Sequence, residues 1–141
     1  MPSRIWGKAS RVVTSDQAGL AILGLTALVR AVSYAPWFVN TDRTPAHWLE
    51  GLLPAPAWSF VWLVIAVACM AAVITPRLLP IAVGLTVAIN TLWALSFIGI
   101  TITGESTRGY VSALGYAAVA FLTMWGFGRG RDIATVRIEK E

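Results

Sequence analysis

A single positive charge interrupts an apolar stretch of this sequence, and it is the residue that most suggests a chemical role. Arg30 is the only charged residue between Gln17 and Phe38. In a helix that begins near Gln17 it lies about thirteen residues in, at or slightly beyond the centre of a lipid bilayer. Placing arginine there costs about 2.5–3.5 kcal/mol on insertion scales, so we expect a polar partner or water beside it.

Asn90 is the partner that the spacing favours. It also lies about thirteen residues into an apolar stretch counted from the same side, and its amide oxygen can accept a hydrogen bond from a guanidinium. Tyr34, one turn beyond Arg30, and Tyr116 can extend this intramembrane polar cluster. Two interpretations stay open. In the first, Arg30 has a structural role: it is paired within the bundle, or it snorkels outward to acidic loop residues or lipid phosphates. In the second, Arg30 lines an aqueous path or gate.

Residues that usually support catalysis are scarce in this chain. It has one histidine, His47, and one cysteine, Cys69, which excludes a disulfide framework, paired-thiol redox chemistry and multi-histidine metal sites. The carboxylates fall at the ends of apolar runs, in loops or in the tail, whereas a proton-coupled exporter needs one at the midplane. They are Asp16, Asp42, Glu50, Glu105, Asp132, Glu139 and Glu141. We predict a protein that is not an enzyme and that has no cofactor and no metal.

Composition identifies lipid as the solvent for most of the chain. Of 141 residues, 57% are hydrophobic and 13% are charged, whereas soluble domains have about 45–50% and about 25%. Four apolar runs each approach the roughly 20 residues that a membrane-spanning helix requires, and none alternates as a barrel strand does. The predicted fold is an all-α bundle of four transmembrane helices, over about 17–38, 57–75, 78–102 and 109–127.

Charges outside these runs predict the domain organisation and the orientation. A basic segment, 1–16, precedes the four-helix domain, 17–127, and a charged tail, 128–141, follows it. Most Lys and Arg residues fall on one side of the predicted membrane, so the positive-inside rule places both termini in the cytoplasm. The residues on that side are Arg4, Lys8, Arg11, Arg77, Arg129, Arg131, Arg137 and Lys140. Their scatter over three short segments argues against a nucleic-acid partner. Cleavage of a signal peptide after Ala35 is the alternative for the first run.

The loop over 40–56 is expected on the outer side of the membrane. A Thr-Pro pair favours a helix start there, so we expect a short amphipathic surface helix whose contact residues are His47, Trp48 and Glu50. Tryptophan is enriched at membrane interfaces because its ring is apolar while its N–H needs a polar partner. Four tryptophans are therefore interpreted as interface anchors: Trp37, Trp58, Trp62 and Trp125.

Small residues recur at helical spacing in three of the runs. Such stripes let helix backbones approach closely, which drives helix association in lipid. The predicted helix-packing residues are Ala27, Ala31 and Ala35 in the first run, Gly84 and Ala88 in the third, and Gly109, Ala113 and Ala117 in the fourth. The pattern leaves open whether the partner helix belongs to the same chain.

Three stretches together carry a family resemblance. They are 106–120 with the later Trp125 and 128–131, the stretch 28–34, and the loop sequence 50–54 followed by Trp58 and Trp62. With these, nearly the whole chain resembles small four-helix membrane proteins encoded by phages of actinobacteria. Members of that group are usually labelled membrane proteins, and some are labelled holins. The resemblance implies a multi-pass protein in the inner membrane of a bacterial host, and it implies no catalytic residues.

Three functions remain open at this point. The first is a holin-like or otherwise membrane-perturbing phage protein that acts through helix association and self-association in the lipid bilayer. The second is a non-enzymatic accessory protein that binds a membrane protein partner, either as a complex subunit or as a factor that blocks a second infection. The third is a small channel or carrier in which Arg30 and Asn90 line a path that prefers anions.

Overall fold

The computed structural model describes residues 16–38 and 44–138, with side chains described as far as residue 128. These residues form four α-helices and two short 3-10 helices, and no strand occurs among them. The elements are α2 (Asp16–Ser33), η1 (Glu50–Leu52), α3 (Ala55–Ile74), η2 (Pro76–Leu78), α4 (Leu79–Ile102) and α5 (Gly109–Ile138). The predicted all-α fold with four long helices is confirmed.

Prolines and one glycine set the boundaries of the central helices. Pro56 and Pro80 each lie in the first turn of their helix, α3 and α4, where the missing N–H has no intrahelical partner to lose. Pro76 follows the end of α3 and opens η2, so α3 and α4 form a tight hairpin. The turn between α4 and α5 contains Gly104 at φ 78°, a left-handed conformation that glycine adopts without a Cβ clash.

Two helix ends differ from the sequence-based boundaries. The first helix ends at Ser33 and continues as turns, because Pro36 lacks an N–H and disfavours helical geometry in the residue before it. The last helix does not end near residue 127 but continues to Ile138 through the charged segment. The predicted charged tail is therefore helical as far as the described residues reach.

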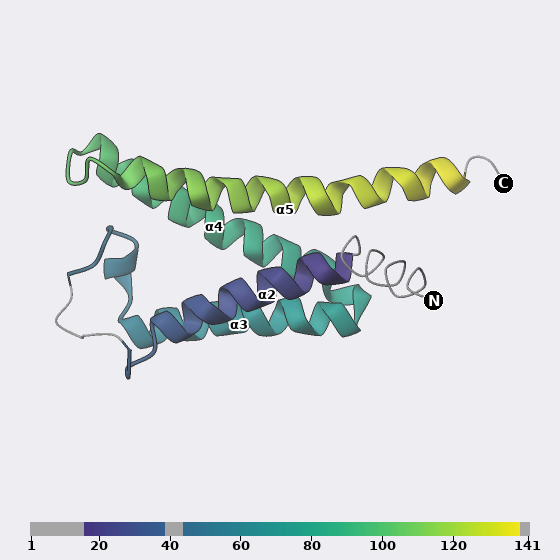
Figure 1. Cartoon of the computed structure of the whole chain (residues 1–141), viewed down its shortest axis with the longest axis horizontal. Coiled ribbons are helices and arrows are strands. Elements are labelled where there is room, and N and C mark those ends of the chain that lie inside the picture. The colour runs from purple at the N-terminus through teal and green to yellow at the C-terminus, as the bar shows by residue number, and fades with distance from the viewer. Residues whose placement is uncertain (1–15, 39–43, 139–141) are drawn as a thin grey trace, which may run out of the picture.

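The helices pack as two antiparallel pairs, α2 with α3 and α4 with α5, joined by η2 (Figure 1). The pairs diverge, so that α5 runs along one side of the molecule while α4 crosses toward α3 (Figure 1). The helix α2 begins, and α5 finishes, at the end of the molecule that contains η2. We call this the η2 end, and we call the opposite end, with residues 44–54 and 103–108, the loop end.

The core lies between the helix pairs and is rich in tryptophan and small residues. Trp62, Cys69 and Trp93 are almost fully buried. The outer faces of the helices are also apolar: Ile22 and Phe121 are 66% and 72% exposed. Three stretches are long and apolar enough to cross a membrane: Ala55–Ile74, Pro76–Ile102 and Gly109–Gly128. The shorter α2, with Asp16 and Arg30, does not meet the same measure.

Candidate functional site

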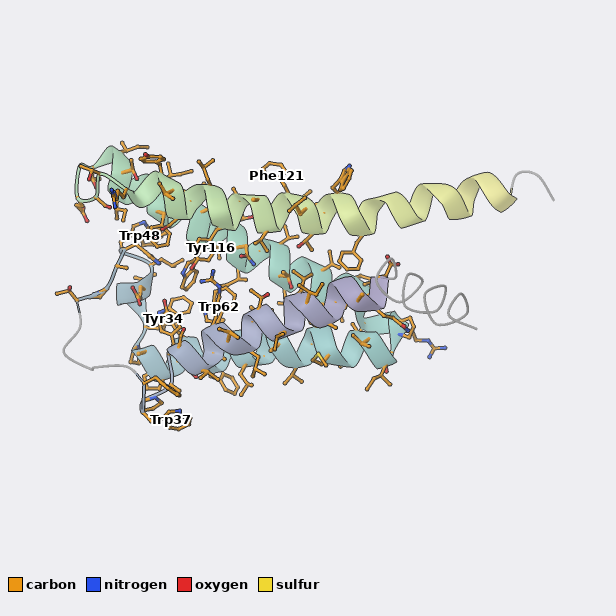
Figure 2. The ribbon with its side chains drawn as sticks, in the orientation of Figure 1. Tyr34, Trp37, Trp48, Trp62, Tyr116 and Phe121 are labelled. Carbon is orange, nitrogen blue, oxygen red and sulfur yellow. The ribbon has the colours of Figure 1, made fainter. Side chains whose placement is uncertain are left out.

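Arg30 lies between two aromatic rings that come from different helix pairs. Its guanidinium carbon is 5.2 Å from the ring centroid of Trp62 on α3 and 4.3 Å from that of Tyr116 on α5, and its Nη1 donates a hydrogen bond to the Tyr116 hydroxyl. Cation–π contacts of this kind are worth about 2 kcal/mol or more when the charge is desolvated. In Figure 2, Trp62 and Tyr116 lie near each other between the helix pairs. The charge on α2 is therefore directed inward and held by aromatic groups.

Asn90 lies near Arg30, but it is not the group that accepts the Arg30 hydrogen bond. Its side chain is buried, and its Nδ2 donates to the backbone oxygen of Thr86 at 2.8 Å, within α4. Arg30 and Asn90 line one small cavity of about 20 Å³. The structure thus brings the two predicted partners to one place, while the hydrogen bond that Arg30 makes goes to Tyr116.

All four helices, α2, α3, α4 and α5, contribute residues to the lining of this cavity. The other lining residues are Leu23, Thr26, Ala27, Trp62, Ile65, Thr86 and Val119. The Trp62 indole N–H is buried and has no hydrogen-bond partner in the described part of the chain. Both threonine hydroxyls donate within their own helices, Thr26 to Ile22 and Thr86 to Ala82, each at 2.8 Å. Tyr34, the fourth predicted member, is half-buried and packs against the core without lining the cavity.

A second polar cluster, formed around His47 and Glu50, joins the loop to the helices at the loop end. The His47 side chain is only 4% exposed, its Nδ1 is 2.7 Å from the Ser96 hydroxyl, and its ring packs edge-on against Trp93 and Phe97. The Glu50 N–H also donates to Nδ1, at 3.3 Å, so this nitrogen is an acceptor and the ring is neutral. Burial lowers the pKa of His47, and the nearby Glu50 carboxylate only partly opposes that effect.

Glu50 completes this cluster. Its carboxylate accepts a hydrogen bond from the Ala46 N–H at 2.6 Å, and its backbone oxygen accepts one from the Trp58 indole at 3.0 Å. The exposed position expected for His47 and Glu50 is therefore wrong, because both satisfy hydrogen bonds inside the protein. Trp48 is 56% exposed, as expected of a contact residue, and its indole lies beside Gly99 of α4. The expected surface helix is reduced to the single 3-10 turn η1.

The tryptophans expected at the membrane interface fall into two groups. Trp37 and Trp125 are 77% and 58% exposed, and Figure 2 shows Trp37 pointing away from the bundle. In contrast, Trp58 and Trp62 face the interior of the bundle, which differs from the lipid-facing position that an interface anchor requires. The sequence carries no signal for this, because α3 is about equally apolar on all its faces. The buried residues of α3 include a regular helical stripe: Trp58, Trp62, Ile65, Cys69 and Ala72.

The predicted small-residue stripes also fall into two groups, those packed within the chain and one that is exposed. Ala27, Ala31 and Ala35 are buried against α3, where the Ser59 hydroxyl donates to the backbone oxygen of Ala31 at 2.7 Å. On α5, Gly109 and Ala113 are buried and Ala117 is half-buried. Gly84 and Ala88, by contrast, are exposed and line an apolar groove of about 540 Å³ between the η2 ends of α4 and α5. Two of the three predicted stripes therefore pack within the chain, and the third has no partner helix against it.

Comparison of the chain with protein-family models, with curated proteins and with solved structures gives no match. Among the described residues, no three His, Cys, Asp or Glu side chains lie close enough together to hold a metal ion. The structure by itself defines an all-α protein with three candidate membrane spans and a half-buried arginine between its helix pairs.

Proposed function

We propose that this chain is a multi-pass membrane protein in which α2 is a fourth span and both termini are cytoplasmic. The outer face of α2 supports this, because Ile22, Leu25 and Val29 are 66%, 61% and 62% exposed, as suits side chains in contact with lipid. The inner face carries Arg30, whose charge is held by Trp62 and Tyr116. Arg30 lowers the mean hydropathy of α2 below that of the other spans. Its contacts with the two rings offset part of the free-energy cost of placing this charge in the membrane.

The topology is tested with reporters fused after residue 141 and inserted in the loop over 40–43. We expect the C-terminal reporter to be active in the cytoplasm and the loop reporter to be active outside. A loop reporter that remains cytoplasmic would mean that α2 does not span, and would remove the proposal. Replacement of Arg30 by methionine makes α2 more apolar, and we expect this variant to have the same topology. It is the control in which α2 inserts through its hydropathy alone, without the charge of Arg30.

We further propose that the protein perturbs the host membrane in a holin-like manner, by lateral association of copies. The observation that carries this proposal is the exposed Gly84–Ala88 face of α4, beside an open apolar groove, in a chain whose other small-residue stripes are packed. Close backbone approach is the main driving force for helix association in lipid, where apolar side chains gain nothing by leaving the acyl chains. The resemblance to phage membrane proteins supports the same setting.

Inducible expression with readouts of membrane potential and dye permeability tests this function. We expect depolarisation above a threshold of expression, with crosslinked oligomers forming at the same time. Gly84→Leu should raise that threshold, because a large side chain blocks close approach at this face. Gly115→Leu is the matched control, since Gly115 is also exposed and has no atom within 4 Å of a Cβ built on it. Normal insertion at high expression with an intact potential would contradict the proposal.

A second candidate function, binding of a membrane or envelope protein, is favoured by one observation at the loop end. Trp48 and Leu52 are 56% and 64% exposed on a loop that His47 and Glu50 hold in place. Exposed aromatic groups on a fixed support are typical centres of binding interfaces. Copurification of a stoichiometric host protein that is lost in Trp48→Ala would support this alternative, and recovery of the protein alone as a self-contained oligomer would count against it.

A further inference from the structure

The cavity beside Arg30 is lined by hydrogen-bond donors that outnumber its acceptors. Nη1 of Arg30 donates to the Tyr116 hydroxyl, which is the one hydrogen bond that the guanidinium makes with the described residues. The guanidinium has five N–H groups, so others remain without an acceptor among these residues. Asn90 uses one amide hydrogen on Thr86 and retains the other. The Trp62 N–H is buried without a partner. No carboxylate lines the cavity.

The size of the cavity limits what can occupy it. Its volume of about 20 Å³ is slightly more than the roughly 10–15 Å³ that one water molecule requires. One monatomic ion fits this space, whereas sulfate, phosphate or an organic acid does not. Water would satisfy the spare N–H groups but would bring no counter-charge to Arg30, which is half-buried and is otherwise held by the rings of Trp62 and Tyr116.

We propose that this cavity binds a single halide ion between Arg30, Asn90 and Trp62. The ion neutralises the guanidinium and accepts hydrogen bonds from the indole N–H and the free amide hydrogen. Fluoride, about the size of water, and chloride, somewhat larger, are the ions that this volume accepts, and iodide is too large. The proposal is independent of lateral association, because every lining residue belongs to one chain.

A groove at the η2 end lies next to the site. It has a volume of about 440 Å³, runs between α2 and α5 from Asp16 and Gly126, and shares Leu23, Thr26 and Val119 with the lining of the cavity. These three residues therefore form a wall common to the groove and the cavity. Asp16 at its mouth carries a negative charge, while Arg77 lies at the same end of the bundle and several further arginines follow in the sequence of α5.

The test is halide-dependent stability of the full chain in detergent micelles. Thermal unfolding and titration calorimetry are measured in sodium fluoride, chloride, iodide and gluconate at equal ionic strength. We expect saturable stabilisation by fluoride and chloride and none by iodide beyond that in gluconate. Equal behaviour in all four salts would overturn the proposal.

Trp62→Phe is the decisive variant because it keeps an aromatic ring against Arg30 and removes only the indole N–H and some volume. Halide affinity should fall about tenfold or more, as expected when one hydrogen bond to a charged group is lost. Trp93→Phe is the matched control, since Trp93 is equally buried but does not line the cavity, and its halide affinity should be unchanged. Unchanged affinity in Trp62→Phe would refute the assignment of the site.

A measurement on the unaltered protein keeps the proposal testable if Trp62→Phe does not fold. Crystals grown in sodium chloride, with data collected at long wavelength, should show one anomalous chloride peak within hydrogen-bond distance of Arg30 and Trp62. A peak only on the protein surface would contradict the site. Because neither result depends on oligomer formation, failure here leaves the holin-like function untouched, and loss of that function leaves the halide site untouched.

Discussion

The two ends of the bundle are held together by different means. At the loop end, hydrogen bonds from side chains join the loop to two helices, through His47 with Ser96 and through Trp58 with Glu50. At the η2 end, α5 is flanked by two grooves, of about 540 Å³ toward α4 and about 440 Å³ toward α2. Phe127 lines both grooves, and its ring lies against Gly19 of α2.

This difference shows what can hold helices together when lipid is the solvent. Apolar side chains have little preference between a helix neighbour and an acyl chain, so tight association requires hydrogen bonds or close backbone approach. The loop end has both, because Gly109 packs directly on the backbone of α4. The groove walls at the η2 end are mainly apolar, and Thr26 and Thr123 in them donate within their own helices, so this is the part left available to lipid or to a second copy. Three substitutions and one change of pH test this difference between the two ends.

The largest effect is expected for Gly109→Ala at the loop end. A Cβ there would lie 2.8 Å from the backbone oxygen of Phe97 and 2.5 Å from the Thr101 hydroxyl, so a helix must move. We expect the free energy of unfolding to fall by about 2–3 kcal/mol, as is usual for overpacking, in denaturation measured in micelles. Gly115→Ala on the same helix is the control and should change stability by less than about 1 kcal/mol. Equal effects would mean that α4 and α5 do not pack closely at Gly109.

Removal of the His47 ring should have the next largest effect. His47→Ala loses the hydrogen bond to Ser96 and the edge-on contacts with Trp93 and Phe97, which together are worth about 2 kcal/mol. Leu52→Ala, at an exposed position in the same loop, should cost much less. Both variants are compared by thermal unfolding and by protease cleavage of the loop. An uncut loop in His47→Ala would contradict the role given to this contact.

The pH dependence of stability should report the same cluster. Burial lowers the pKa of His47, so the unfolded chain binds this proton more readily than the folded protein does. Stability is therefore complete above about pH 6.5, the ordinary value for histidine, and falls as the pH drops below it toward the lowered pKa. The slope for one proton cannot exceed about 1.4 kcal/mol per pH unit. His47→Asn, which keeps an acceptor and does not titrate, should remove this component, and an unchanged pH profile in that variant would argue against it.

The smallest effect is expected at the η2 end. Gly84→Ala adds a Cβ that meets no atom within 4 Å, so the stability of the single chain should not fall and should change by less than about 1 kcal/mol. Unfolding in micelles at protein concentrations too low for association measures this. A loss as large as that of Gly109→Ala would mean that the groove beside Gly84 is closed, and the contrast between the two ends would then disappear.

Much of the fold and part of the site could be predicted from the sequence. Long apolar runs separated by charges and prolines require helices, because backbone groups in lipid must satisfy one another within the helix. Arg30 in the first run requires a polar or aromatic neighbour, and the alternation of runs and short turns requires antiparallel packing.

Only the tertiary structure decided how each helix is rotated and which side chains meet. In a soluble protein the boundary between apolar and polar faces sets that rotation, but these spans are apolar on all sides, so the pattern does not distinguish a lipid-facing residue from a core residue. Gly84 and Gly109 therefore look alike in sequence, yet one is exposed and the other is buried. For the same reason Tyr116 rather than Asn90 accepts the hydrogen bond of Arg30, because that choice depends on where two helix pairs cross and on no spacing within the chain.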